Sequence, residues 1–172
     1  KDMITKLKAA QGTQFTAKVE GMLKDFEMRA DNTAEFLEQL AEKQKTGSVW
    51  AGDQQVPAKA LGCEATVHVI TTHFWPSQTA VNTLPRGVFS TVMQQYEAFF
   101  NEKHSQGKRL TWKFVLGDAE VEAKFPKKKF TIKCATLQAM ALSLINDAAG
   151  AMSTEGFINE MGCSVDVIKR VL

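Results

Sequence analysis

The stretch that decides the fold reads Leu110-Thr-Trp-Lys-Phe-Val-Leu-Gly-Asp-Ala-Glu-Val-Glu-Ala-Lys-Phe125. Apolar and polar residues alternate on both sides of Gly117-Asp118, which is typical of two strands joined by a turn and buried on one face. A polar turn follows at Pro126–Lys129, and the alternation then resumes from Phe130 to Cys134. The pattern predicts an antiparallel meander of strands.

Beyond the meander, the period changes to helical spacing over residues 136–146, where Leu137, Met140, Ala141 and Leu144 form an apolar stripe. A helix with one apolar stripe is expected to cover the buried face of the meander. This sheet-and-helix half-domain is the unit on which the rest of the chain is expected to pack.

Composition limits the class of protein. The chain has 172 residues, 44% of them hydrophobic and 23% charged, which is enough for a proper core. No apolar run approaches the roughly 20 residues of a membrane helix. With 21 basic and 19 acidic residues, the net charge of +2 gives little support for nucleic-acid binding. The three cysteines are too far apart for a zinc site and indicate reduced thiols in a cytosolic or nuclear protein.

The first 45 residues have helical spacing. Gly12 and Gly21 are expected to weaken the helix without ending it. We expect a break at Asp31–Thr33, whose last two residues are candidate caps of a second helix. Residues 46–63 have no period and are interpreted as a loop.

A further strand is predicted at Glu64–Thr72, where small and β-branched residues alternate, and Pro76 ends it. A helix from Gly87 to His104 follows, with a dense apolar stripe. Residues 153–172 form a helix, a glycine turn at Gly162 and a second helix, which is the shape of a helix-turn-helix. Because both ends of the chain fall within amphipathic patterns, we expect a fragment of a longer protein.

No chemistry of catalysis or metal binding is predicted. His68, His73 and His104 have no cysteine or carboxylate at ligand or triad spacing, and no nucleotide-binding or nucleophile motif occurs. The sequence therefore predicts no catalytic, cofactor-binding or metal site. A small enzyme is the least favoured function.

Two basic features have alternative interpretations. Lys127–Lys129, flanked by Phe125 and Phe130, is either a nucleic-acid-binding hairpin tip or a solvated turn whose aromatics point into the core, and we favour the turn. The last helix offers only Lys169 and Arg170 for reading bases, which disfavours DNA binding. Trp75 and Trp112 are interpreted as core anchors, or as hot spots for a protein partner if they line a groove.

Several stretches together resemble the cullin family, in the part called the cullin homology domain. Phe-Thr-x-Lys-x-Glu-Gly-Met and Arg-Leu-x-Trp are specific in combination, although each is weak alone. The matching stretches run in order through the chain: Met3–Lys8, Phe15–Asp25, Phe74–Pro76, Tyr96–Phe100, Lys103–Ser105, Lys108–Trp112, Leu116-Gly117, Ala123–Phe125, Leu137-Gln138, Asn146-Asp147 and Glu155–Leu172.

This resemblance implies a non-catalytic scaffold of a RING ubiquitin ligase, in the cytoplasm and nucleus. Cullins hold a RING-box protein, which recruits the ubiquitin-conjugating enzyme, and an N-terminal arm binds substrate adaptors. In the family, a strand of the RING-box protein is added to the α/β sheet, and an open sheet edge can accept it. The candidate receiving strands are Glu64–Thr72 and Leu110–Leu116. The side chains expected to meet the partner strand are Val67, Val69, Thr71, Trp75, Leu110, Trp112 and Phe114.

The resemblance also implies the domain organisation and an α+β fold class. Residues 1–45 would end a four-helix bundle, 46–63 would be a linker, 64–147 the α/β domain, and 153–172 the start of a winged-helix region. The expected order is therefore a helical portion, a small mainly antiparallel sheet packed with helices, and a helix-turn-helix. The adaptor arm and the modified lysine of the family have no counterpart here, and Lys169 is not assigned that role.

Overall fold

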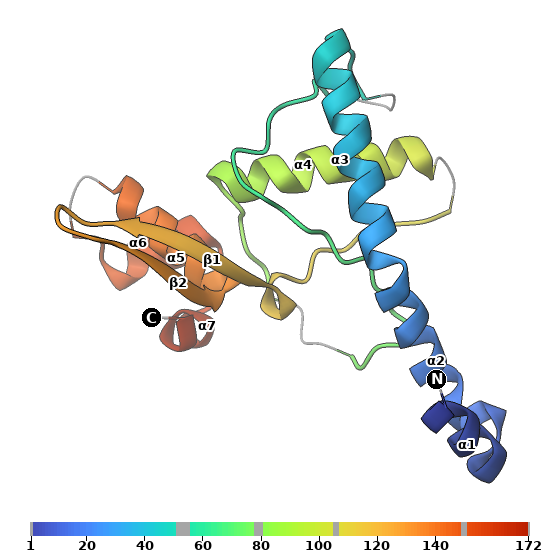
Figure 1. The fold of residues 1–172 in the computed structure, drawn as a ribbon. Coiled ribbons are helices and arrows are strands. Elements are labelled where there is room, and N and C mark those ends of the chain that lie inside the picture. Colours follow the sequence, from blue (N-terminus) through green and yellow to red (C-terminus); the bar gives the residue numbers. More distant parts are fainter. Residues whose placement is uncertain (1, 51–55, 78–80, 105–106, 149–150, 172) are drawn as a thin grey trace. The chain divides into compact units, whose positions relative to one another are not determined.

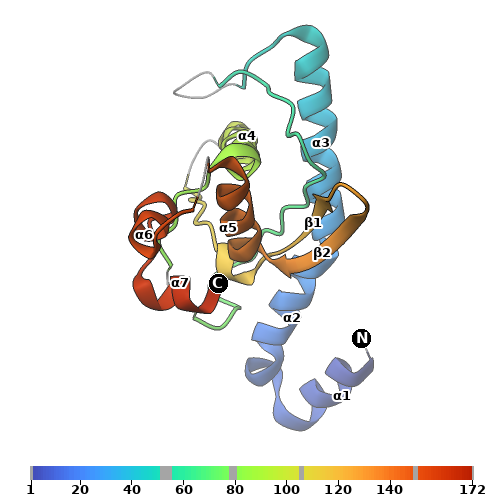
Figure 2. The same ribbon diagram turned by 90° about the vertical axis from the view of Figure 1, so that its left-hand side faces the viewer.

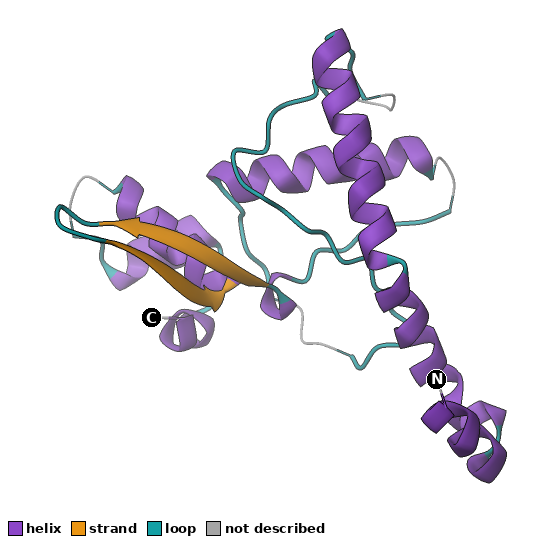
Figure 3. Cartoon of the chain, in the orientation of Figure 1, coloured by secondary structure: helices purple, strands orange, loops and turns teal. Residues whose placement is uncertain are grey.

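The computed structural model describes residues 2–50, 56–77, 81–104, 107–148 and 151–171. Its fold is mixed α+β, with helices first, then a two-stranded antiparallel sheet packed on helices, then further helices, which confirms the predicted fold class (Figures 1 and 3). The chain divides into two compact units, residues 1–78 with 94–106, and residues 79–93 with 107–172. The elements are α1 (Asp2–Gln11), α2 (Thr13–Glu27), α3 (Arg29–Thr46), α4 (Gly87–Lys103), η1 (Phe114–Leu116), β1 (Asp118–Lys124), β2 (Lys129–Ala135), α5 (Thr136–Asp147), α6 (Thr154–Met161) and α7 (Val165–Val171).

The helices of the first unit divide at other places than predicted. Gly12 does end α1, because it adopts a left-handed φ of 84° that a glycine tolerates. The next junction is Met28, whose right-handed helical angles let α3 continue nearly in line with α2 (Figure 1). The predicted break at Asp31–Thr33 is wrong. Thr33 is an interior, buried residue of α3 and caps nothing.

An aromatic cluster forms the core of the first unit. Phe36 of α3 is fully buried, with its ring centroid 5.0 Å from Tyr96 and 5.4 Å from Phe99 of α4. Trp50 is 1% exposed and stacks on Phe36, so the loop that follows α3 contributes to the core. The Gln95 side chain fixes this loop by accepting hydrogen bonds from Trp50 Nε1 and Lys59 N and donating one to the Pro57 carbonyl.

The second unit is built on one hairpin. Asp118 pairs with Ala135 and Lys124 with Lys129, so the turn lies at residues 125–128, one residue earlier than the turn predicted at Pro126–Lys129. The helix predicted at 136–146 is confirmed as α5, and Figure 2 shows it beside the hairpin. Its buried face joins α6 and α7 in the core of this unit. The buried core residues are Leu137, Met140, Ala141, Phe157, Met161, Cys163 and Ile168.

Both predicted receiving strands are corrected. Residues 110–113 have no regular structure and Phe114–Leu116 is a single 3₁₀ turn, so Gly117 connects this turn to β1 instead of joining two strands. Gly117 is required there because a Cβ would lie 2.4 Å from Thr136 Oγ1. Residues 64–72 are also outside any strand. The meander therefore has two strands, because each of the other alternating segments lacks a ladder partner within the part of the chain described.

The C-terminal helix pair is confirmed. Ser153 caps α6, with its Oγ accepting a hydrogen bond from Gly156 N at 3.1 Å. Gly162 ends α6 at φ 65°, and α7 follows at Val165. None of the helices in the described ranges is long and apolar enough to cross a membrane.

Candidate partner-strand site

One carboxylate holds the end of the segment predicted as the first receiving strand. Asp25, on α2, accepts hydrogen bonds from Thr71 N at 2.7 Å and from Thr71 Oγ1 at 3.0 Å. The same carboxylate accepts the indole N–H of Trp75 at 2.8 Å. Charge-assisted bonds of this length are stronger than neutral ones. Asp25 therefore fixes the backbone at Thr71 and the tryptophan that follows it.

Further contacts hold the same segment against the helices. Thr33 Oγ1 on α3 donates a longer hydrogen bond, 3.4 Å, to the Val67 carbonyl. Phe74 packs over Gly21 so closely that a Cβ there would lie 2.3 Å from its ring. Trp75 also contacts Phe26, with ring centroids 5.4 Å apart. The α2–α3 helices thus hold this segment without any strand ladder.

Burial along this segment still follows the predicted alternation. Val67 and Val69 are half-buried, whereas Thr66 before them and His68 between them are exposed. Ile70 departs from the alternation, because it is also half-buried. Thr71 is exposed and Trp75 is half-buried, so Trp75 is anchored at one end without being a core residue. The structure thus brings Thr71 and Trp75 together on Asp25 and places Val67 against Thr33.

The other predicted site residues belong to the second unit. Leu110, Trp112 and Phe114 are all half-buried, and the Trp112 and Phe114 rings stack with centroids 5.8 Å apart and planes 11° from parallel. Phe114 also packs against the core of α5, α6 and α7. These three residues form one group, and the four residues of the 64–75 segment form another in the first unit.

The hairpin tip corrects one sequence interpretation. Phe125 and Phe130 are 59% and 52% exposed, so they do not point into the core as the favoured interpretation required. Their rings meet edge to face at 5.8 Å. The opposite face of the hairpin carries ion pairs, including Lys133 with Glu120 at 2.9 Å. That carboxylate, first by its hydrogen bond and then by its charge, raises the pKa of Lys133.

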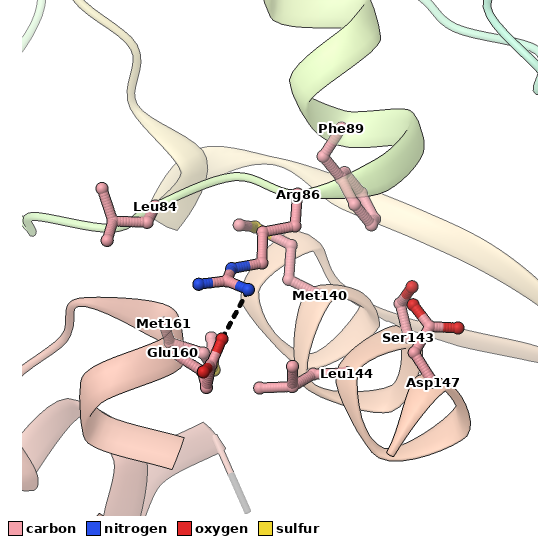
Figure 4. A pocket seen from close by; sticks show the side chains of 9 residues that line it. All are labelled: Leu84, Arg86, Phe89, Met140, Ser143, Leu144, Asp147, Glu160 and Met161. Carbon is pink, nitrogen blue, oxygen red and sulfur yellow. Dashed lines mark ion pairs between the residues drawn. The ribbon is translucent and has the colours of Figure 1, made fainter. Parts of the chain in front are cut away.

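A small cavity of about 120 Å³ lies in the second unit, and Figure 4 shows its lining. The lining residues are Leu84, Arg86, Phe89, Met140, Ser143, Leu144, Asp147, Glu160 and Met161. Arg86 forms an ion pair with Glu160 at one side of it. The lining holds Ser143 as its only hydroxyl, has no histidine or cysteine, and includes the carboxylates of Asp147 and Glu160.

Metal and thiol chemistry find no support in the described part of the chain. Within those residues, no group of three or more histidine, cysteine or carboxylate side chains could hold a metal ion. Burial raises the pKa of the Cys63 and Cys134 thiols, which lowers their thiolate fraction and their reactivity. The predicted site residues in 64–75 and 110–114 instead present backbone groups and mostly half-buried side chains.

Sequence reasoning missed the two residues that position the segment. Asp25 lies within the Phe15–Asp25 stretch that resembles cullins, yet an acidic residue on a helix is usually solvated, so no role was predicted. Thr33 was interpreted as a helix cap. No local pattern marks either residue, because their partners are 46 and 34 positions away in the chain.

Comparisons with known proteins show which class of protein domain this fold belongs to. Residues 69–172 match the family model described as Cullin alpha+beta domain. The match covers the hairpin, its helices and the end of residues 64–72, the tethered segment that Asp25 and Thr33 hold. The chain therefore carries a cullin-type α+β domain.

Curated relatives extend the similarity to the first unit. The chain is 33% identical to Cullin-3 of Dictyostelium discoideum over 86% of its length and to Cullin-2 of Arabidopsis thaliana over all of it. It is 28% identical to human Cullin-4A over 87% of its length. These alignments cover 17%, 21% and 18% of the three relatives, so the chain spans about a fifth of their length. The chain belongs to the cullin family.

Proposed function

We propose that this chain is the part of a cullin-RING ubiquitin ligase scaffold that binds a RING-box protein, and that it does so by accepting a strand. The chain itself performs no catalysis in this proposal. It brings a ubiquitin-conjugating enzyme into the assembly only through the RING-box protein. Substrate adaptors would bind through the N-terminal helical arm that the resemblance to cullins implies, and the assembly would act in the cytoplasm and nucleus.

One observation carries the proposal. Residues 64–72 have the alternation and the β-branched composition of a strand, yet they pair with no strand among the described residues. An alternating segment fixed on one side and unpaired on the other is a template for an added strand. Family membership supplies the kind of partner, because the RING-box strand is what the resemblance to cullins implies.

The second segment supports the same proposal. Leu110, Trp112 and Phe114 alternate in sequence and are half-buried, without belonging to a strand. Trp112 has the size and amphipathic character of an interface hot spot. A guest strand paired with either segment would satisfy backbone groups that now lack a ladder.

DNA binding through the C-terminal helix pair is the alternative, and no observation favours it. Helix α7 has seven residues, and its Lys169 and Arg170 remain the only basic side chains suited to base contact. Steep salt dependence of binding to a duplex would be its signature.

Co-expression with a RING-box protein tests the proposal. We expect the two proteins to co-purify in equal amounts, and we expect the chain expressed alone to be poorly soluble because its strand edges are open. Trp112→Asp should abolish the complex, since it puts a charge in place of a half-buried apolar side chain. Lys45→Asp, at the exposed end of α3, is a charge-changing control that should keep it. Two folded proteins that do not associate would contradict the proposal.

A further inference from the structure

The hairpin of the second unit ends in a tip, residues 124–130, that extends beyond the helices of that unit. Helix α5 begins directly after β2, so it lies at the end of the hairpin where Asp118 pairs with Ala135. Ala135 is six residues after Lys129, which is about 20 Å at the rise of a strand. Figure 2 shows the turn of the hairpin pointing away from α5, α6 and α7. The core of this unit includes no residue of the tip.

The tip concentrates positive charge. It reads Lys124-Phe-Pro-Lys-Lys-Lys-Phe130, with four lysines, and no acidic residue occurs from Ala123 to Ile132. The whole chain has a net charge of only +2, so the residues outside the tip have a net charge of −2. The small net charge of the chain is therefore a poor guide to what the tip can bind, because local charge attracts a ligand.

The lysines of the tip are only weakly compensated. Lys124 and Lys129 lie directly opposite each other, and like charges in that arrangement cost stability. One carboxylate serves both, with Glu122 Oε1 3.8 Å from the first ammonium and 3.4 Å from the second. All three side chains are more than half exposed, so these ion pairs are weak. Lys127 and Lys128 are exposed in the turn. The tip thus retains positive charge for an anionic ligand.

Two aromatic rings lie beside these charges and are open to solvent. Phe125 and Phe130 are 59% and 52% exposed, with ring centroids 5.8 Å apart and planes at 73°. The strand ladder fixes the backbone at one ring, and the hydrogen bond from Phe125 N to Lys128 O, 2.9 Å long, closes the turn beside the other. Because the sequence alone favoured rings that point into the core, their exposure restores the interpretation of the tip as a nucleic-acid site.

The rings and the paired lysines occupy opposite faces of a narrow hairpin. Phe130 pairs with Ala123 and Lys129 with Lys124, and successive pairs point to opposite faces of a sheet. The two strands are only about 4.8 Å apart, and lysine side chains are long and flexible, so their ammonium groups reach the rim of either face. A polyanion that crosses the end of the hairpin therefore meets rings on one face and cations at the turn and rim.

We propose that the tip binds single-stranded nucleic acid, with bases stacked on Phe125 and Phe130 and phosphates held by the four lysines. Each nucleotide of a single strand offers a phosphate and an open base face, which matches this combination of side chains. A duplex hides its base faces in its own stack, and the carboxylates of an acidic peptide leave the rings without a stacking partner. Stacking and phosphate contacts carry little sequence information, so we expect binding without strong sequence preference.

Fluorescence anisotropy of short labelled oligo(dT) and oligo(U) tests the proposal. The whole chain is titrated as a fusion to a soluble tag, and the tag alone is the blank. We expect saturable binding whose logarithm falls with the logarithm of salt concentration at a slope of about −3. Binding of one polymer only would identify the sugar that the site accepts. No saturable binding of either polymer at about 50 mM salt would overturn the proposal.

Ring variants separate stacking from apolar contact. Phe125→Leu/Phe130→Leu keeps apolar surface but removes the aromatic faces, and we expect about tenfold weaker binding. Phe125→Tyr/Phe130→Tyr should bind within about threefold of the wild type, because it keeps both faces. Both variants should fold, since the tip lies outside the core. Equal affinity of the leucine variant and the wild type would contradict stacking.

Charge variants locate the site on the chain. Lys127→Gln/Lys128→Gln should weaken binding and halve the salt slope. Lys169→Gln/Arg170→Gln removes the same charge from exposed residues of α7 and should leave affinity and slope unchanged. The opposite result would move the site to the C-terminal helix pair and overturn the proposal.

A polyglutamate peptide tests whether charge alone suffices. We expect it to displace the labelled strand at least about tenfold less effectively than unlabelled oligo(dT), because it cannot stack. Equal displacement would identify the ligand as an acidic polypeptide and overturn the assignment to nucleic acid. None of these outcomes depends on whether a RING-box protein binds elsewhere on the chain.

Discussion

The hairpin of β1 and β2 and the segment at residues 64–72 have the same alternating pattern but different structures. The hairpin forms a seven-pair ladder, whereas the other segment is held by side chains of α2 and α3 and forms none. In both, side-chain exposure follows a period of two over at least part of the length. The comparison shows that alternation determines which side chains are covered, while pairing depends on what the chain offers as a neighbour.

Chain connectivity explains the difference. A turn of four residues joins the two strands of the hairpin, so the entropic cost of bringing them together is small. The 64–72 segment has an irregular loop before it and the turn at Thr71–Phe74 after it, so neither sequence neighbour can supply a strand. Asp25 and Thr33 take the place of a ladder on one side.

Alkaline pH should produce the largest difference in unfolding free energy between the two units. Burial, and then the charge of Glu35, raises the pKa of Tyr96 in the first unit to about 12 from an ordinary value of 10. The folded state therefore keeps a proton that the unfolded chain loses above pH 10, and stability falls as pH rises from about 10 to 12. Two pKa units correspond to about 3 kcal/mol.

Tyr96→Phe should remove this loss of stability between about pH 10 and 12. Fluorotryptophan NMR can follow Trp50 in the first unit and Trp112 in the second separately during alkaline unfolding. The sequence has a single tyrosine, so the hairpin unit holds no phenol. Lys133 and Cys134 in that unit also have raised pKa values, but Lys133 is exposed and Cys134 is only half-buried. Equal pH dependence of the variant and the wild type would contradict the prediction.

Gly21→Ala should release the tethered segment while leaving the hairpin intact. The new Cβ would lie 2.3 Å from the Phe74 ring, so the ring must move. We expect a loss of about 2 kcal/mol in urea unfolding of the first unit, since overpacking outweighs the gain in helix propensity. The double variant Gly21→Ala/Phe74→Ala is the matched control. Gly21→Ala should cost less unfolding free energy in the Phe74→Ala background than in the wild type. Equal costs in the two backgrounds would refute the contact.

Asp25→Ala should have a smaller effect on stability than Gly21→Ala. It removes three hydrogen bonds that are partly exposed, and we expect a loss of about 1.5 kcal/mol. Exchange of the Thr71 amide, measured in the free protein, should speed up by at least about tenfold. Asp31→Ala, an exposed residue in the first turn of α3, is the control and should leave Thr71 protected. Unchanged exchange in Asp25→Ala would show that the tether does not hold the segment.

Phe130→Asp at the hairpin tip should have the smallest effect. Phe130 is 52% exposed and loses only part of its burial and its contact with Phe125. We expect less than about 1 kcal/mol in thermal unfolding, because the ladder and α5 hold the hairpin. Ala139→Asp, at a site on α5 that is 2% exposed, should by comparison unfold the second unit. A large loss in Phe130→Asp would show that the tip is part of the core.

Much of the fold could be predicted from the sequence where the signals are local. The helical stripe at Leu137 and Met140 and the glycine turn at Gly162 lie where the pattern placed them, and the hairpin turn lies one residue before its predicted position at Pro126–Lys129. Each depends on residues a few positions apart, so neighbouring chemistry determines it.

The rest depends on contacts between distant residues. Trp50 was in a stretch interpreted as a plain loop, and only its bond to Gln95, 45 residues later, makes it a core residue. The strands expected at 64–72 and 110–116 were wrong because alternation does not specify a partner. Asp25 was missed because its carboxylate looks solvated until Thr71 and Trp75 are placed beside it.

Amide exchange of residues 64–72, compared with that of β1 and β2 in the same sample, tests the central claim most directly. The claim is that this unpaired segment gains its ladder from a second polypeptide. Adding a RING-box protein should slow exchange across 64–72 by about a hundredfold, the protection of newly formed ladder bonds, and leave the hairpin unchanged. A stable complex in which 64–72 exchanges as fast as in the free chain would contradict the account.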